Sequence, residues 1–226
     1  MSTRKSREER ARRALHRRSN TRAARGAPSA VVLAAGASSR FLGTKQLAEI
    51  GGKTLIETVI LAIPAAEVGE TVVVLGHKAS AMAERIGAMK GIKVVVNQQY
   101  RAGMATSIRA GISALGDGPG GALLLLADQP FVTRSLLRRM LKAFAARDGK
   151  GKIVAAAYRG LVAPPVIFSR SYFHELTALR GNRGARSIIE RHPGSLHLVR
   201  VRSRDVFADI DTREGLEAAR RLLLQR

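Results

Sequence analysis

Two cations five positions apart, Arg40 and Lys45, follow a run of small residues in VVLAAGASSRFLGTKQL, residues 31–47. Small side chains at positions 34–36 let a ligand approach the backbone, and successive N–H groups after a strand can cradle phosphate oxygens. The two cations would then neutralise a polyphosphate. The glycine spacings of a Walker loop and of a dinucleotide fingerprint are both absent. A plain strand-to-helix turn with solvated charges is the alternative interpretation.

A carboxylate follows an entirely apolar run in LLLLADQP, residues 123–130. A strand that ends near Ala127 would place Asp128 at the carboxyl end of a central strand, where open α/β sheets bind ligands. Magnesium takes oxygen ligands, commonly one or two carboxylates together with substrate phosphates. The pattern therefore indicates Asp128 as a magnesium ligand. The alternative is a loop-starting aspartate that accepts hydrogen bonds from nearby backbone N–H groups.

A third stretch, NQQYRAGMATSIRAG at residues 97–111, places Gly103 just before an expected helix. Ser107 would fall on the inward face of that helix with Ile108 and Gly111. The start of the helix could therefore meet a ribose or a base edge. A small inward serine can equally serve only to permit close packing.

The last stretch, DIDTREGLEAA at residues 209–219, holds two aspartates that could supply a second oxygen ligand to the metal. A structural role competes with this one, because Asp211 and Glu214 have the spacing of a capping box for the final helix. The choice between Asp209 and Asp211 as ligand and cap stays open at this point.

Alternating elements must position these side chains. From Ala30 onward, short apolar runs rich in β-branched residues alternate with longer stretches of helical spacing, which is typical of a parallel sheet covered by helices. The expected strands are residues 30–34, 71–75, 93–97, 122–126, 153–157, 165–168 and 196–201. The sequence thus predicts an α/β fold with one large sheet.

Helices are expected between these strands. Thr54 and Glu57 form a capping box at the start of one helix, and Pro64 ends it. Three others are expected over residues 104–115, from Thr133 and from near Thr212. On the helix over residues 104–115, the spacing places four apolar residues on one face: Met104, Ile108, Ile112 and Leu115.

The composition excludes several classes of protein. The 226 residues include no cysteine, which excludes disulfide scaffolds, thiolate zinc sites, iron–sulfur clusters and cysteine nucleophiles. The longest apolar run, residues 122–127, is far shorter than the roughly 18 residues needed to span a bilayer. We therefore expect a soluble, cytoplasmic protein without a membrane partner.

The chain carries 39 Lys and Arg against 17 Asp and Glu, a net charge of +22, which favours anionic partners. Residues 1–28 hold ten of the basic side chains and two of the acidic ones. We expect this segment to be a disordered or transiently helical tail, followed by a single domain over residues 29–226. A solvated extension, a transit peptide and a nucleic-acid-binding arm are alternatives, although no aromatic residues are interleaved for base stacking.

Taken in order, these motifs resemble the molybdenum cofactor cytidylyltransferases and related small nucleotidyltransferases. The resemblance covers roughly residues 29–226 and rests on VVLAAGASSR…K, Asn97…Tyr100…Gly103…Ser107, LLLADQP, GNRGAR at 181–186 and DIDTREGL. It implies a three-layer αβα, Rossmann-like domain of glycosyltransferase-A type, with a mixed, mostly parallel sheet of about seven strands. It also implies magnesium-dependent transfer of a nucleotidyl group, preferentially CMP from CTP, to the phosphate of a molybdopterin-type cofactor, with loss of pyrophosphate.

The resemblance implies a role for each matching residue. For the nucleotide it implies Leu33, Ala34, Ala35, Gly36, Arg40, Lys45, Gly103 and Ser107. For catalysis it implies Arg40, Lys45 and Asp128, for magnesium Asp128 and Asp211, and for the acceptor Arg183 and Arg186. Such a reaction needs positioning and charge neutralisation rather than a covalent intermediate.

Three departures from the family pattern limit this transfer of roles. Leu42 stands where the family usually has glycine, so the turn between the two cations must differ. Asn182 replaces a usual aspartate, and the run 163–165 reads Ala-Pro-Pro instead of Gly-His-Pro or Gly-Asn-Pro. The last two departures concern the acceptor more than the reaction type.

Several alternatives therefore remain open. The Ala-Ala-Gly loop and Asp-Gln-Pro favour the cytidylyl branch over the GTP-using guanylyl branch. A sugar phosphate or other small phosphate is the alternative acceptor, and a molybdenum enzyme is a further expected docking partner. A basic protein that binds nucleic acid or a partner is the non-enzymatic alternative.

Overall fold

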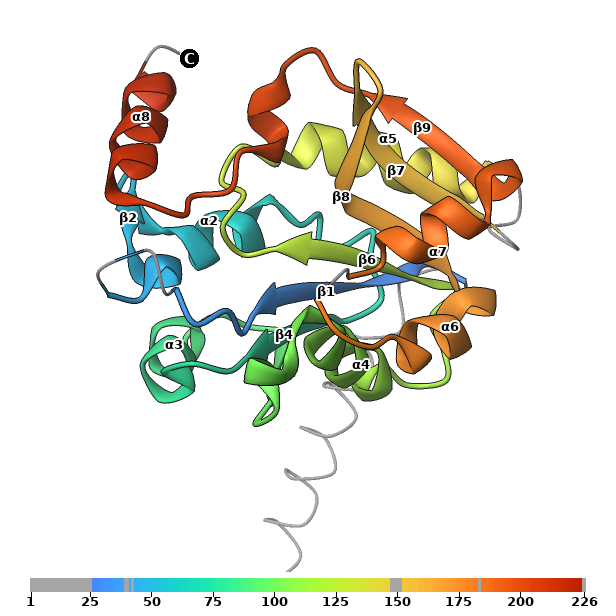
Figure 1. The fold of residues 1–226 in the computed structure, drawn as a ribbon, viewed down its shortest axis with the longest axis horizontal. Helices are drawn as coiled ribbons and strands as arrows, with labels where there is room; N and C mark the ends of the chain where they lie inside the picture. The colour runs from blue at the N-terminus through green and yellow to red at the C-terminus, as the bar shows by residue number, and fades with distance from the viewer. Residues whose placement is uncertain (1–25, 39–40, 42, 147–151, 183, 225–226) are drawn as a thin grey trace, which may run out of the picture.

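A seven-stranded sheet forms the centre of the molecule in the computed structural model, which describes residues 26–38, 41, 43–146, 152–182 and 184–224 (Figure 1). Its strands are β1 (Pro28–Ala34), β4 (Thr71–Leu75), β5 (Ile92–Val96), β6 (Gly121–Leu126), β7 (Ile153–Tyr158), β8 (Leu161–Ser169) and β9 (Leu196–Arg200). A separate two-stranded hairpin joins β2 (Glu49–Ile50) to β3 (Lys53–Thr54).

The strand order is β5-β4-β1-β6-β8-β7-β9. Strand β1 lies parallel between β4 and β6, while β8 runs antiparallel to both of its neighbours, β6 and β7. The edge strands β5 and β9 pair parallel to β4 and β7. The predicted mixed, mostly parallel sheet is confirmed, and the carboxyl ends of β1, β4, β6, β7 and β9 meet at one edge.

Helices cover both faces of the sheet, with α4 and α6 on one side and α5 on the other (Figure 1). The helices are α2 (Leu55–Ala62), α3 (Ala79–Ile86), α4 (Met104–Ala114), α5 (Arg134–Ala145), α6 (Phe173–Ala178), α7 (Arg186–Arg191) and α8 (Arg213–Leu224). Short 3-10 turns are η1 (Lys45–Leu47), η2 (Tyr100–Ala102), η3 (Arg170–Tyr172), η4 (Pro193–Ser195) and η5 (Arg204–Phe207). None of the described helices is long and apolar enough to cross a bilayer.

Alternation along the central strands divides the core into two layers. Val32 and Leu125 pack with α5 in one cluster, whereas Val31 and Leu124 pack with α4 in the other. The approach of α4 to β1 depends on Gly111, because a Cβ there would lie 2.4 Å from Cγ1 of Val31. The small residue therefore lets the helix lie directly on the sheet.

A third apolar cluster fixes the chain near its C-terminal end. Leu216 and Ala219 of α8 pack with Ile50, Leu55 and Phe131, all of which are buried. Figure 1 shows α8 beside β2, far in sequence but adjacent in space. This contact holds the segment that precedes α8 across the carboxyl edge of the sheet.

The structure corrects two details of the sequence interpretation. Met104 is 41% exposed and does not join Ile108 and Ile112 in the buried face of α4, because it lies at the first turn, against the loop that contains Gly184. Strand β8 begins at Leu161 rather than near residue 165, since a register shift in the β7–β8 ladder accommodates the two prolines inside it.

Candidate active site

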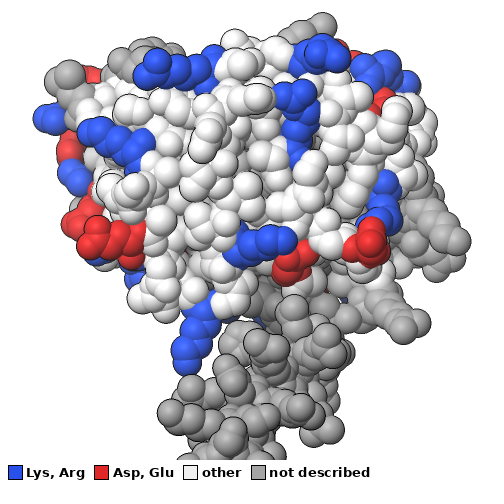
Figure 2. Space-filling model, turned by 90° about the horizontal axis from the view of Figure 1, so that it is seen from below, with Lys and Arg blue, Asp and Glu red and all other residues white. Residues whose placement is uncertain are grey.

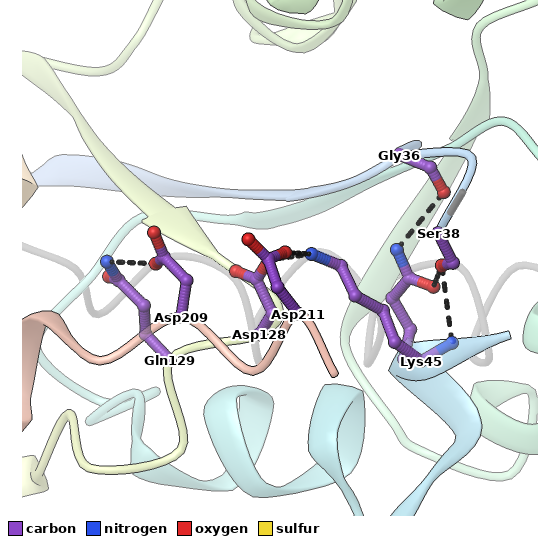
Figure 3. Close-up of polar contacts among 8 residues, drawn as sticks. Gly36, Ser38, Lys45, Asp128, Gln129, Asp209 and Asp211 are labelled. Atoms are coloured by element: carbon purple, nitrogen blue, oxygen red, sulfur yellow. Dashed lines mark hydrogen bonds and ion pairs between the residues drawn. The ribbon is translucent and has the colours of Figure 1, made fainter. Parts of the chain in front are cut away.

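Three charged side chains from distant parts of the chain meet at the carboxyl edge of the sheet (Figure 3). The Nζ atom of Lys45 donates to Oδ2 of Asp128 at 2.5 Å and to Oδ1 of Asp211 at 2.7 Å. The side chains of Lys45 and Asp128 are only 12% and 16% exposed, and that of Asp211 is 32% exposed. Two carboxylates thus converge on a single position that holds a cation.

The electrostatics of this group keep Lys45 charged. Burial alone would lower the pKa of Lys45, but the opposite charges and hydrogen bonds of Asp128 and Asp211 outweigh it and raise the pKa above its ordinary value. Lys45 is therefore an ammonium at neutral pH. It offsets the repulsion that the two carboxylates would otherwise exert on each other.

The loop after β1 holds η1, and with it Lys45, in place. Oγ of Ser38 accepts from the backbone N–H of Lys45 at 3.2 Å and donates to Oε1 of Gln46 at 3.1 Å. Nε2 of the buried Gln46 donates to the carbonyl of Gly36 at 3.3 Å. Sequence reasoning missed these positioning roles of Ser38 and Gln46; the only signal was a polar residue between the strand and Lys45 and another directly after Lys45.

The end of β1 falls inside the predicted nucleotide-binding loop, Leu33 to Gly36. Leu33 and Ala34 belong to the strand and pair with Val74 and Leu75 of β4, so their backbones form part of the sheet. Ala35 and Gly36 lie beyond the strand, where backbone N–H groups can face a ligand. Arg40, the second predicted cation, lies outside the described residues.

Backbone hydrogen bonds tie the two aspartate segments together. The N–H of Ala127 donates to the carbonyl of Leu33 at 3.1 Å, and the N–H of Ile210 donates to the carbonyl of Asp128 at 3.0 Å. Asp211 therefore lies beside Asp128, and it contacts the ammonium of Lys45.

The start of α8 settles the competing interpretation of Asp211. The hydroxyl of Thr212 accepts from the N–H of Gly215 at 3.1 Å and so caps the helix. The expected capping box is wrong in its capping residue, which is Thr212 rather than Asp211, and Oδ1 of Asp211 accepts from Nζ of Lys45.

Asp209, the other candidate ligand, turns to Gln129 rather than to Lys45. Its Oδ1 accepts from Nε2 of Gln129 at 2.9 Å, while Oε1 of Gln129 is buried without a hydrogen-bond partner among the described residues. Asp209 as a whole residue is exposed, but partial burial of its carboxyl and the charge of Asp128 raise its pKa. A third carboxyl, more easily protonated, thus lies beside the pair that holds Lys45.

The predicted base or ribose site forms a separate buried polar cluster at the start of α4. Nδ2 of Asn97 donates to Oγ1 of Thr106 at 2.8 Å and to Oγ of Ser107 at 3.0 Å. Ser107 is 5% exposed, so its hydroxyl is held within the fold. Gly103, whose φ is +111°, leaves room for Gly181, because a Cβ at Gly103 would lie 2.7 Å from its carbonyl oxygen.

The two arginines expected on the acceptor side differ in what the structure describes. Arg186 lies on the surface of α7, where it forms an ion pair with Glu190 at 2.9 Å and is 77% exposed. Arg183 lies outside the described residues. The structure does not bring Arg186 into the group formed by Lys45 and the aspartates.

The donor atoms suit a hard divalent cation. Within the described ranges, no group of three or more His, Cys, Asp or Glu side chains is arranged to hold a metal. Asp128 and Asp211 nevertheless converge on one cationic atom, and magnesium is commonly held by one or two carboxylates together with substrate phosphates. The residues therefore fit a metal that is completed by a phosphorylated ligand.

Proteins of known sequence provide an independent comparison. The nicotine blue oxidoreductase of Paenarthrobacter nicotinovorans is 29% identical over 195 residues, which cover 82% of this chain and 93% of that protein. The bifunctional protein GlmU of Trichlorobacter lovleyi is 28% identical over 130 residues, 57% of this chain. The match covers only 28% of GlmU, so this chain spans little more than a quarter of that longer relative.

Solved structures and a family match provide two further comparisons. Rv0371c from Mycobacterium tuberculosis H37Rv superposes with a TM-score of 0.77 at 28% identity, covering 87% of this chain and 98% of that one. Its complex with manganese gives a TM-score of 0.73 at 26% identity over the same shares. Residues 30–198 match the family described as the MobA-like NTP transferase domain. Since that match spans most of the chain, the protein belongs to the MobA-like NTP transferase family and is an enzyme of the nucleotidyltransferase class.

Proposed function

We propose that this enzyme transfers CMP from CTP to the phosphate of a molybdopterin-type molybdenum cofactor and releases pyrophosphate. The observation that carries the proposal is the convergence of Asp128 and Asp211 on the Lys45 ammonium at the carboxyl edge of the sheet. This arrangement supplies both oxygen ligands for a divalent cation and a positive charge for phosphate. Membership of an NTP transferase family supports the same reaction class.

The resident metal in this proposal is magnesium, held by Asp128 and Asp211 together with phosphate oxygens of the nucleotide. When bound, it would neutralise charge on the triphosphate and on the departing pyrophosphate. The manganese complex of the mycobacterial relative supports a divalent cation for this fold. The two carboxylates are the groups of this chain that fit that role.

The chain's own groups position and neutralise the reactants. A phosphate oxygen of the acceptor attacks the α-phosphorus of CTP, and the bond from that phosphorus to the bridging oxygen of the β-phosphate breaks. The attacking phosphate is already anionic, so the reaction needs no general base. Lys45 stabilises the negative charge that grows on the leaving pyrophosphate, and the backbone beyond β1 at Ala35 and Gly36 faces the nucleotide.

The choice of CTP and of a molybdopterin-type acceptor rests on the sequence motifs. The Ala-Ala-Gly loop that ends at Gly36 and the Asp-Gln-Pro run that begins at Asp128 resemble the cytidylyl branch of the family. The GTP-using guanylyl reaction and a sugar phosphate acceptor are the alternatives that the same site would serve.

The test measures pyrophosphate release with each of CTP, GTP, ATP and UTP, in the presence of magnesium and molybdenum-loaded molybdopterin. CTP should give the fastest release, and Asp128→Asn should lose at least about a hundredfold in rate. Asp117→Asn is the matched control, because Asp117 is fully exposed and pairs only with Arg170 in the described structure. Release that is independent of the acceptor, or equal in Asp128→Asn and wild type, would contradict the proposal.

A second candidate comes from the relative named as an oxidoreductase, which matches most of this chain. In this alternative, the protein would catalyse an oxidation–reduction reaction, the class that the name of that relative states. No dinucleotide glycine fingerprint occurs in the sequence, which favours the transferase. Oxidation of NADH or NADPH by nicotine blue in the presence of the enzyme, with no pyrophosphate released from any triphosphate, would favour the oxidoreductase.

The surface charge gives little support to a nucleic-acid role. On the face that Figure 2 shows, Lys and Arg side chains are scattered over the face and its rim, separated by uncharged surface and by carboxylates. Binding to a phosphate backbone favours a continuous basic stripe. The basic segment at residues 1–28 lies outside the described residues. Salt-sensitive RNA binding that disappears when residues 1–28 are deleted would assign that role to the segment.

A further inference from the structure

A hollow opens at the carboxyl edge of the sheet, apart from the Lys45 group. Its volume is about 480 Å³, within the range of small-molecule sites. It is lined by the end of β7, the turn that follows it and the end of β9, including Ala157, Tyr158, Arg159, Leu198, Arg200 and Arg202. We call this hollow the arginine pocket.

The topology places the arginine pocket in line with the aspartates. Ala157 pairs with Arg200 at the ends of β7 and β9, and both strands run in the same direction as β6, which leads to Asp128. In the order β6-β8-β7-β9, neighbouring strands lie about 4.8 Å apart, so the pocket is displaced by roughly 10–14 Å from the end of β6. That distance suits the two ends of one organic molecule.

The pocket opens on the α4 side of the sheet. Ile153 and Ala155 of β7 pack in the core layer that contains α4, and Ala157 follows them in the same alternation. Leu196 on β9 packs in that layer too, and the partly exposed Leu198 follows it. The floor of the pocket is therefore apolar, and it lies on the same face as the helix that carries Ser107.

Three arginines surround this floor, and no acidic residue lines the pocket. Arg159, Arg200 and Arg202 form no ion pair with any other residue in the part of the chain that the structure describes. In contrast, many exposed arginines are paired with carboxylates: Arg85, Arg138, Arg170, Arg186, Arg191 and Arg220. The charges of the pocket are thus available for an anion.

The turn that carries Arg159 holds it in a costly conformation. Tyr158 and Leu161 pair across a two-residue turn in which Arg159 has a φ of +46° and Gly160 a φ of +86°. Such turns favour Asn, Asp or Gly at the first position, and a side chain such as that of Arg is disfavoured there. Non-glycine residues in this region occur preferentially at ligand-binding sites. The guanidinium lies 5.4 Å from the centre of the Tyr158 ring, which holds it over the pocket wall.

We propose that the arginine pocket binds a second anionic group of the acceptor, an oxyanion carried on its organic body away from the reacting phosphate. The body lies on Leu198 and Ala157, and the anion contacts the three guanidinium groups. This inference rests on the proposed function, because the reacting phosphate of the same acceptor lies at the Lys45 group. The site therefore selects acceptors with two anionic groups roughly 10–14 Å apart over those with one.

The first test measures binding without catalysis. Phenyl phosphate, a dianion on an apolar ring, is titrated and followed by ³¹P NMR with wild type and with a triple variant, Arg159→Gln, Arg200→Gln and Arg202→Gln. The triple variant should bind at least about tenfold more weakly. The matched control, Arg138→Gln with Arg170→Gln and Arg220→Gln, removes the same charge elsewhere and should bind like wild type. Equal weakening in both triple variants would overturn the proposal, since net charge alone would then explain the binding.

The second test measures steady-state transfer with magnesium, CTP and the molybdopterin acceptor. The pocket triple variant should raise KM for the acceptor at least about tenfold and leave KM for CTP unchanged. A raised KM for CTP alone, or selective loss of binding to a single-stranded oligonucleotide, would overturn the acceptor assignment.

If no triphosphate supports transfer but phenyl phosphate still distinguishes the two triple variants, only the proposed function fails. If transfer occurs and both triple variants match wild type, only the pocket fails.

A single variant guards against misfolding of the triple variant. Arg159→Gly removes one guanidinium and relieves the backbone at the turn. Its Tm should equal or exceed that of wild type, while its affinity for phenyl phosphate should fall about threefold. Weaker binding together with a lower Tm would contradict the specific role of Arg159.

Discussion

The ammonium of Lys45 lies 2.5 Å from Oδ2 of Asp128, a residue 83 positions further along the chain, and also contacts Asp211. An internal cation thus neutralises two carboxylates that would otherwise repel each other at the carboxyl edge of the sheet. The same two carboxylates are the proposed metal ligands. Lys45 therefore stabilises the site in the absence of a metal, and its charge also suits a triphosphate.

Replacement of Lys45 by Met tests both roles. We expect transfer to slow by about 10²–10³, as for the loss of a positive group at a developing negative charge. Tm in the presence of a chelator should also fall, because Asp128 and Asp211 lose their counter-ion. Millimolar Mg²⁺ or Mn²⁺ should then raise Tm more in the variant than in wild type, measured by differential scanning fluorimetry.

Lys90→Met is the control for that experiment, because Lys90 is exposed in the segment after α3. It should leave transfer rate and Tm unchanged. If metal raised the Tm of wild type and of Lys45→Met equally, the metal would not replace the Lys45 ammonium as the counter-ion of Asp128 and Asp211. That result would contradict the proposed metal ligands.

Much of the fold was predictable because burial leaves a strong pattern. Each of the seven expected strands is present in the sheet, since runs such as the one that ends at Leu126 are apolar throughout. The short elements β2, β3, α3, α6 and α7 gave no comparable pattern. The longer extent of β8 was hidden by Pro164 and Pro165, which argue against a strand unless a register shift accommodates them.

The candidate site was only partly predictable for a different reason. Asp128 follows an apolar strand, so its place could be read locally. The partnership of Lys45 with Asp211 joins residues 166 positions apart and depends on the packing of α8 against Ile50. No local pattern encodes such a contact. Ser107 shows a different limit of the sequence. Its inward position on α4 could be predicted, but the sequence does not show that its hydroxyl accepts a hydrogen bond from Asn97.

The capping box of α2 predicts a pH-dependent loss of stability. Glu57 accepts from the N–H and the hydroxyl of Thr54 and pairs with Arg85. Burial would raise the pKa of Glu57, but these contacts outweigh it and lower the pKa. Its contribution is therefore fully present above the unfolded value of 4.5 and is lost as the pH falls through the lower folded pKa.

Glu57→Gln should accordingly reduce the free energy of unfolding by about 1 kcal/mol at pH 7, measured by urea denaturation. The difference from wild type should shrink steadily as the pH falls below 4.5. Glu84→Gln, at an exposed position on α3, is the matched control and should show no such trend. If the difference in the free energy of unfolding between Glu57→Gln and wild type stayed constant down to acid pH, the charge of Glu57 would contribute nothing to stability.

The contact between α4 and the loop at residues 181–184 predicts a strict requirement at Gly103. A Cβ there would lie 2.3 Å from Oδ1 of Asn182, and the φ of +111° disfavours any side chain. Gly103→Ala should therefore cost about 1–3 kcal/mol in the free energy of unfolding, because the loop must move away from the helix. Gly194→Ala is the control, since a Cβ at Gly194 would meet nothing within 4 Å. Equal stability of the two variants would contradict the close approach.

Asp209 predicts a gain in stability on loss of charge. Burial and the neighbouring Asp128 raise the pKa of Asp209 in the folded protein, so its ionised form is less favourable there than in the unfolded chain. This cost begins as the pH rises above the unfolded value of 3.8 and is complete above the raised folded pKa. Asp209→Asn should thus have a higher Tm than wild type at pH 7 in the presence of a chelator.

The amide oxygen of the substituted residue can still accept the hydrogen bond from Gln129, so the variant removes the charge and keeps the contact. The gain in Tm should vanish below pH 3.8, where wild-type Asp209 is itself protonated. Asp117→Asn, at a fully exposed carboxylate, should show no such gain at pH 7. A gain of the same size at both pH values would assign the effect to packing, and no gain at pH 7 would mean that Asp209 does not experience the charge of Asp128.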